Sequence, residues 1–200
     1  MESLANEVAL APATSDNGVW QRHIPARYLP DALKGRVARS RWGTAGGFPI
    51  LHLGAPTNSV IVEAYRHLVD PVEDDVLSQL APRRLVTCRV SVTDLLDLRT
   101  STARMTLGLP MSILTSETHD REAYETCQRV AATAHQLGLH GLITPAATTM
   151  GETLALFTQN LPDAQRPILL DDELWDTLPA DPRRQPGRRL RVVSDDPEGN

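Results

Sequence analysis

The chain lacks several features that would define its class at once. Among its 200 residues only two are cysteines, Cys88 and Cys127. They stand far apart, so we expect neither a disulfide framework nor a zinc site, and this usage fits a reducing cytoplasm. Aromatic residues make up 4% of the chain, so aliphatic side chains must fill the core. No apolar run approaches the roughly 18–20 residues of a membrane-spanning helix, and we expect no membrane insertion.

Lysine is also scarce, because Lys34 is the only one and the other basic residues are arginines. The net charge of −5 argues against direct nucleic-acid binding. The acidic stretch 1–7 argues against a secretory signal. P-loop, dinucleotide-fingerprint and Gly-x-Ser-x-Gly motifs are missing, and the histidines lack metal-ligand spacing, so no metal is expected.

Hydrophobic patterning predicts one α+β domain over residues 18–178. Helices and strands mix without regular alternation. The segments 47–54, 85–92, 142–144 and 153–157 read as strands. One helix follows a cap at Thr57 or Asn58 and stops before Pro71, and a second runs from a cap at Asp120 to Gly138.

The two ends of the chain carry no such pattern. Residues 1–17 are predicted to form a flexible arm. Residues 179–200 are polar and proline-rich, and we expect a disordered tail in which 190–193 forms at most a short strand.

Three chemically useful side chains, Arg41, His52 and Glu63, recur at intervals of eleven positions. They are expected in a glycine-rich loop, in the strand that follows it and in the next helix. An arginine beside glycines can bind a phosphate, and a carboxylate can stabilise a developing cation. Each residue also has an ordinary interpretation: a surface arginine, a solvent-facing glutamate and a hydrogen-bonded core histidine.

Longer stretches around these residues resemble the RES-domain family, the toxin halves of many bacterial toxin–antitoxin pairs. The resemblance rests on the segments 20–28, Arg41-Trp42, 49–53 and Val62-Glu63, and downstream on 124–128 and 138–147. The family implies a fold like that of the ADP-ribosyltransferases, a split mixed sheet with flanking helices around an NAD cleft. It also implies cleavage or phosphorolysis of NAD, neutralisation by an Xre-type helix-turn-helix antitoxin, and possible homo-oligomers.

The resemblance implies the following site. Glu63, Arg41 and His52 are the catalytic candidates, and NAD, the substrate, is held by Arg22, Arg41, His52 and Tyr28. His52 stands where the family usually has tyrosine, and Ala146 where it has serine.

These departures leave two alternatives to an enzyme that cleaves the nicotinamide–ribose bond. One is a catalytically degenerate module that binds a partner protein or a nucleotide. The other is a protein ADP-ribosyltransferase.

Overall fold

A computed structural model describes residues 2–72, 77–118 and 120–184. Six strands form one mixed sheet in the order β1-β2-β5-β4-β3-β6. The strands are β1 (Ala13–Pro25), β2 (Ile50–Ala55), β3 (Arg83–Asp97), β4 (Gly141–Pro145), β5 (Glu152–Phe157) and β6 (Ile168–Trp175).

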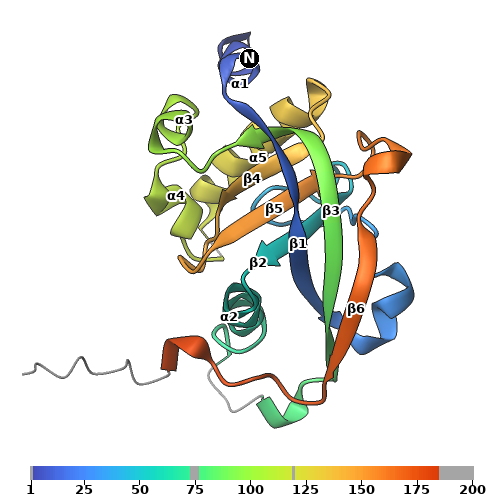
Figure 1. The fold of residues 1–200 in the computed structure, drawn as a ribbon. Coiled ribbons are helices and arrows are strands. Elements are labelled where there is room, and N and C mark those ends of the chain that lie inside the picture. The colour runs from blue at the N-terminus through green and yellow to red at the C-terminus, as the bar shows by residue number, and fades with distance from the viewer. Residues whose placement is uncertain (1, 73–76, 119, 185–200) are drawn as a thin grey trace, which may run out of the picture.

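The sheet consists of two antiparallel groups. Strand β3 pairs with β1 along most of its length and with β6 on its other side. Strand β5 pairs with β2 and β4. The groups join where the end of β3 runs parallel to β4, and at the pair Gln21–Gly54 between β1 and β2. Figure 1 shows the first group crossing the second at a steep angle.

Helices flank this sheet: α1 (Glu2–Leu10), α2 (Thr57–Leu68), α3 (Ser101–Thr106), α4 (Met111–Thr115) and α5 (Arg121–Gln136). Short 3₁₀ turns lie at η1 (Ala26–Asp31), η2 (Leu77–Gln79), η3 (Asp163–Gln165) and η4 (Pro182–Arg184). The apolar stripe of α5 packs against β4 and β5 through Cys127, Val130, Ala131 and Ala134. Helix α2 packs through Val60, Ile61 and Tyr65 onto Leu85 and Trp175.

The prediction of a single mixed α+β domain is confirmed, as are the four predicted strands and two predicted helices. The Asp120 carboxylate accepts a hydrogen bond from the Ala123 N–H at 3.1 Å, and Gly138 has the positive φ of +83° expected after a helix. The predicted cap of α2 is wrong. Pro56 occupies that position, and the Thr57 hydroxyl donates instead to Gln21 Oε1 at 2.7 Å.

The prediction of a flexible arm over residues 1–17 is also wrong. Helix α1 covers 2–10, and Val8 is buried in the same core cluster as α5, with Leu4 packed against it. Strand β1 begins at Ala13, so the rest of the arm belongs to the sheet. Strands β1 and β6 escaped prediction because neither shows a clean alternation of apolar and polar residues.

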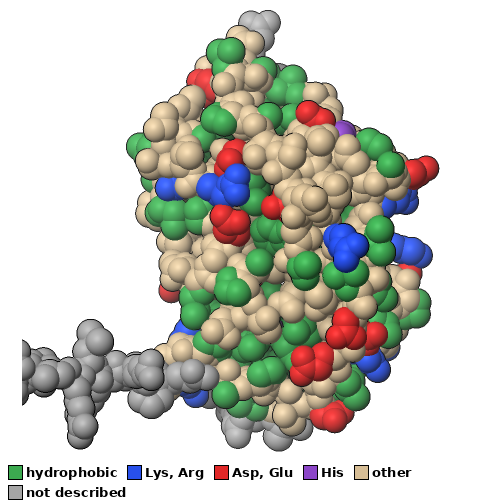
Figure 2. Space-filling model, in the orientation of Figure 1, with side chains coloured by type: hydrophobic (Ala, Val, Ile, Leu, Met, Phe, Trp, Pro, Cys, Tyr) green, Lys and Arg blue, Asp and Glu red, His purple; other side chains and the backbone are tan. Residues whose placement is uncertain are grey.

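At the C-terminal end, residues 179–184 pack on α2: Tyr65 Oη donates to the Pro179 carbonyl at 3.0 Å, and Arg183 pairs with Asp70. The remainder of the predicted tail, including the short strand at 190–193, lies outside the described residues. Over the described ranges, none of the helices has both the length and the apolarity to cross a membrane. The face drawn in Figure 2 carries acidic and basic side chains interspersed rather than one basic patch.

Candidate functional site

A pocket of about 400 Å³ lies where α2, β1, β2 and the loop before β2 meet, a volume typical of small-molecule sites. Residues from the segments 114–118 and 144–147 also line it. Its charged lining, within the part of the chain that the structure describes, consists of Arg22, Arg39, Arg41, Arg66 and Glu63. This positive excess contrasts with the chain's net charge of −5 and favours an anionic ligand.

Helix α2 presents Glu63 to the pocket because Val60 and Ile61 take the buried side of the helix. Arg66 and His67, three and four positions further on, share the face of Glu63 and also line the pocket. Glu63 Oε1 lies 3.2 Å from His67 Nε2. The carboxylate is half-buried, so a ligand in the pocket can reach it.

His52 lines the pocket from β2, while its neighbour Leu51 is buried in the core. Burial, then the positive charge of Arg22 and the proximity of His67, lowers the pKa of His52 to about 4. The ring is therefore neutral at physiological pH and opposes neither a cationic substrate nor a cationic transition state.

The turn Ser40–Gly43 carries Arg41 into the pocket. The Ser40 N–H donates to the Gly43 carbonyl at 2.8 Å and closes the turn. From α5, the side-chain amide of Gln128 donates to the carbonyls of Ser40 and Gly43 at 2.8 and 3.0 Å. Ser40 Oγ lies 3.4 Å from His52 Nε2, so the turn also contacts the ring. Gln128 thus links α5 to the turn that carries Arg41.

Arg22 enters the pocket from β1 with part of its hydrogen-bonding capacity unused. Its Nη1 donates to the Ala32 carbonyl at 3.0 Å, and its buried Nε has no partner among the described residues. Burial, followed by repulsion from Arg36, lowers the pKa of Arg22 to about 10. The guanidinium stays charged at neutral pH, and an anion would stabilise it.

Beside Arg22, the imidazole of His23 is also neutral. Arg83 Nε donates to His23 Nδ1 at 2.8 Å. Burial, then the charge of Arg83, lowers the pKa of His23 to about 3.

Arg41 is anchored on the segment between α4 and α5. Its Nη1 donates to the Ile113 carbonyl at 2.8 Å and to Ser116 Oγ at 3.0 Å, and its Nη2 donates to the Ser116 carbonyl at 2.8 Å. The guanidinium carbon lies 4.7 Å from the centre of the Tyr124 ring. These contacts fix the orientation of the guanidinium at the pocket wall.

Comparison with known proteins decides the family. The family model described as RES domain matches residues 17–179. The chain belongs to the RES domain family. It is also similar to a chain in the crystal structure of the MbcT–MbcA toxin–antitoxin complex from M. tuberculosis, with 25% sequence identity and a TM-score of 0.75. The match covers 88% of this chain and 93% of that one. A search of the curated proteins gives no match.

In this RES domain, four of the five predicted site residues, Arg22, Arg41, His52 and Glu63, line the same pocket. Tyr28 does not line it. It lies in η1, where Arg36 stands 4.5 Å and Arg27 4.9 Å from the centre of its ring. The geometry therefore gives no support to contact between Tyr28 and a ligand in this pocket.

The hydroxyl groups near the position of the family's serine are arranged as follows. Ala146 lines the pocket, and Thr148 is buried with its Oγ1 2.7 Å from Ser59 Oγ on α2. Ser59 and Thr144 line the pocket as well. Ser59, a hydroxyl-bearing residue of α2, thus lines the same pocket as Ala146, which sequence reasoning did not find.

Sequence reasoning also missed Arg66 of this RES domain, although one signal was available. Arg66 follows Glu63 by three positions, so a helix that turns Glu63 into a pocket turns Arg66 toward it too. Over the described ranges, the pocket included, no group of three or more histidine, cysteine or acidic side chains is placed to hold a metal ion.

Proposed function

We propose that this RES domain is a toxin-like enzyme that cleaves NAD at the nicotinamide–ribose bond. One observation carries the proposal: Glu63 and a set of arginines that includes Arg22 and Arg41 line one pocket of small-molecule size. NAD combines an anionic pyrophosphate with a bond whose cleavage builds positive charge. The pocket offers cations for the first and a carboxylate for the second.

The chemistry needs little beyond positioning and electrostatics. The bond from C1′ of the ribose to the nicotinamide nitrogen breaks, and its electron pair neutralises the pyridinium. Positive charge then develops on the ribose, as in glycoside hydrolysis. Glu63 would stabilise that charge and orient the ribose hydroxyls or the incoming water or phosphate. Arg22 and Arg41 would hold the pyrophosphate.

His52 is compatible with this reaction because its ring is neutral. With a pKa of about 4, the imidazole adds no positive charge near the developing cation at pH 7. Its role would be to pack against nicotinamide or ribose, as the family's tyrosine is expected to do.

The wider setting of the proposal comes from the family. The similarity to a chain of a toxin–antitoxin complex supports an antitoxin as partner, and we propose one of the Xre helix-turn-helix type. The two crossing strand groups support assignment to the ADP-ribosyltransferase-like folds. We also propose that the protein is located in the cytoplasm and that it self-associates.

The test is NAD consumption by the purified chain, with and without phosphate, beside Glu63→Gln. This change removes the negative charge and keeps the shape of the side chain. We expect turnover to fall by about 100-fold or more, as when other electrostatic stabilisers of a transition state are removed. A phosphate requirement would identify phosphorolysis, and activity without phosphate would identify hydrolysis.

The matched control is Glu173→Gln on β6, an exposed glutamate that does not line the pocket. It should keep full activity. Equal activity of Glu63→Gln and the unmodified chain would refute the role of Glu63. Absence of NAD loss in every arm would favour a partner-binding module.

A further inference from the structure

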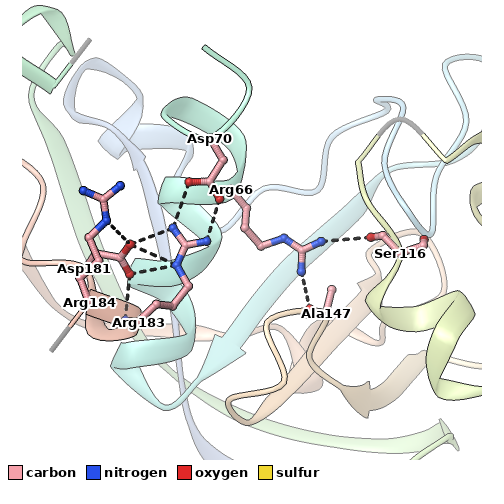
Figure 3. A network of polar contacts seen from close by, with 7 residues as sticks. All are labelled: Arg66, Asp70, Ser116, Ala147, Asp181, Arg183 and Arg184. Carbon is pink, nitrogen blue, oxygen red and sulfur yellow. Dashed lines mark hydrogen bonds and ion pairs between the residues drawn. The ribbon is translucent and has the colours of Figure 1, made fainter. Parts of the chain in front are cut away.

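Two guanidinium groups that line the pocket meet at one backbone carbonyl. Arg41 Nη2 and Arg66 Nη2 both donate to the Ser116 carbonyl, at 2.8 and 3.0 Å. Arg41 comes from the loop before β2, and Arg66 comes from α2. Figure 3 shows Arg66 extending from α2 to Ser116, with its other branch on the Ala147 carbonyl.

Backbone groups hold this pair in place. Ala147 lies in a turn that the Ala146 N–H closes by donating to the Gly151 carbonyl at 2.8 Å. The Ser116 hydroxyl donates to the Ile113 carbonyl at 3.0 Å, which orders the segment that receives both arginines. The two cations are therefore positioned before any ligand arrives, which lowers the entropic cost of binding one.

The pair also lacks a counter-ion of its own. Within the described residues, neither Arg41 nor Arg66 forms an ion pair with a carboxylate. Glu63 is near enough for its charge, like those of Arg41 and Arg66, to act on the pKa of Tyr124, which burial raises. The charge of Arg66 also acts on Asp70, whose main partner is Arg183. Two guanidinium groups at one carbonyl, neither of them in an ion pair among the described residues, favour an anion beside them.

Free donors remain for such an anion. A guanidinium carries five N–H groups. Arg66 uses two of them on the carbonyls of Ala147 and Ser116, and the other three have no partner among the described residues. Both side chains line the pocket, so an anion bound there would lie beside their guanidinium groups.

We propose that Arg66 and Arg41 together form a binding site for a phosphate group. Two forked donors at a shared wall match the several acceptor oxygens of a tetrahedral phosphate. The site shares Arg41 with the pyrophosphate contacts proposed above and adds Arg66, which lines the same pocket. Only the identity of the phosphate, either in the dinucleotide or free in solution, rests on the proposed function.

The experiment measures ligand binding by calorimetry and does not depend on turnover. The probes are inorganic phosphate, ADP-ribose and nicotinamide riboside, which lacks phosphate. The proteins are the unmodified chain, Arg66→Met, Arg66→Lys and the control Arg129→Met, an exposed arginine of α5 outside the pocket. Thermal melting verifies that each variant is folded.

We expect Arg66→Met to weaken binding of ADP-ribose, inorganic phosphate or both by about tenfold or more, the effect of losing charge-assisted hydrogen bonds. Arg66→Lys should lose less affinity, because lysine keeps the positive charge and lacks only the paired N–H donors of a guanidinium. Nicotinamide riboside should bind all variants alike, and Arg129→Met should bind like the unmodified chain. Loss confined to ADP-ribose assigns the site to the dinucleotide, and loss that includes inorganic phosphate assigns it to free phosphate.

Unchanged binding of both phosphate-bearing probes to folded Arg66→Met would overturn the proposal. If Arg66→Met does not fold, arginine modification of the unmodified chain by phenylglyoxal decides instead. Protection of Arg41 and Arg66 by phosphate or ADP-ribose supports the site, and equal modification with and without them overturns it. Failure to consume NAD would refute the proposed function. The phosphate-binding site would still be decided by the binding measurements alone.

Discussion

His52 is the residue whose chemistry the sequence described least well. From sequence alone its charge would vary near pH 6.5, the ordinary pKa of histidine. In the structure, burial lowers the pKa of His52 to about 4. The sequence identified the position through its spacing from Arg41 and Glu63 and through the resemblance to the RES-domain family. It could not show the low pKa, which depends on Arg22 and on burial by other segments.

We predict that His52→Tyr raises NAD turnover by about two- to tenfold, because a larger ring gains stacking contact with nicotinamide or ribose. Steady-state kinetics at pH 6, 7 and 8 tests this. Because His52 is already neutral over that range, its titration should add no pH dependence between pH 6 and 8. A clear loss of turnover in His52→Tyr would instead assign the imidazole a role of its own.

Among the elements, α2 depends on the segment after β6 for its position. The Asp181 carboxylate is buried and receives Arg183 Nε at 3.0 Å and Nη2 at 2.9 Å. The same guanidinium pairs with Asp70, just beyond the end of α2, at 2.7 and 3.0 Å (Figure 3). Hydrogen bonding to Arg183 lowers the pKa of Asp181, so the ionised carboxylate favours the folded state.

We predict that Arg183→Met lowers the free energy of unfolding by about 1–3 kcal/mol, because it leaves a buried carboxylate without its main partner. Arg184→Met is the matched control. Arg184 Nε approaches Asp181 only to 3.6 Å and its side chain is 76% exposed, so the change should stay within about 0.5 kcal/mol. Urea denaturation at pH 7 compares them, and equal midpoints for the two variants would refute this role of Arg183.

The elements that the sequence predicted are those with strong local signals. Helix α5 has a capping aspartate, an apolar stripe and a terminal glycine, and β3 alternates clearly. Strand β1 was missed because its pairing with β3, not an apolar pattern, stabilises it. Helix α1 was missed for a similar reason, since only its packing against α5 explains the burial of Val8. Such long-range contacts cannot be read from a short window of sequence.

For the whole molecule, the fold brings together residues that are far apart in the chain. Arg22, Arg41, His52 and Glu63 reach one pocket from β1, a loop, β2 and α2. The regular interval of eleven positions between Arg41, His52 and Glu63 indicated that these three residues belong to one site. The approach of Ser116 and Ala147 to Arg66 depends on segments 50 and 81 positions away, and no local pattern shows it.

The most direct test of the proposed reaction is to count products while the purified chain consumes NAD. Chromatography of the reaction mixture measures nicotinamide released for each NAD lost. Cleavage at the nicotinamide–ribose bond predicts one nicotinamide per NAD, with both rates falling together in Glu63→Gln. Loss of NAD with appearance of AMP and nicotinamide mononucleotide would show that a different bond is cut. If no NAD is lost between pH 6 and 8, with or without phosphate, the proposal that this chain is an NAD-cleaving enzyme is contradicted.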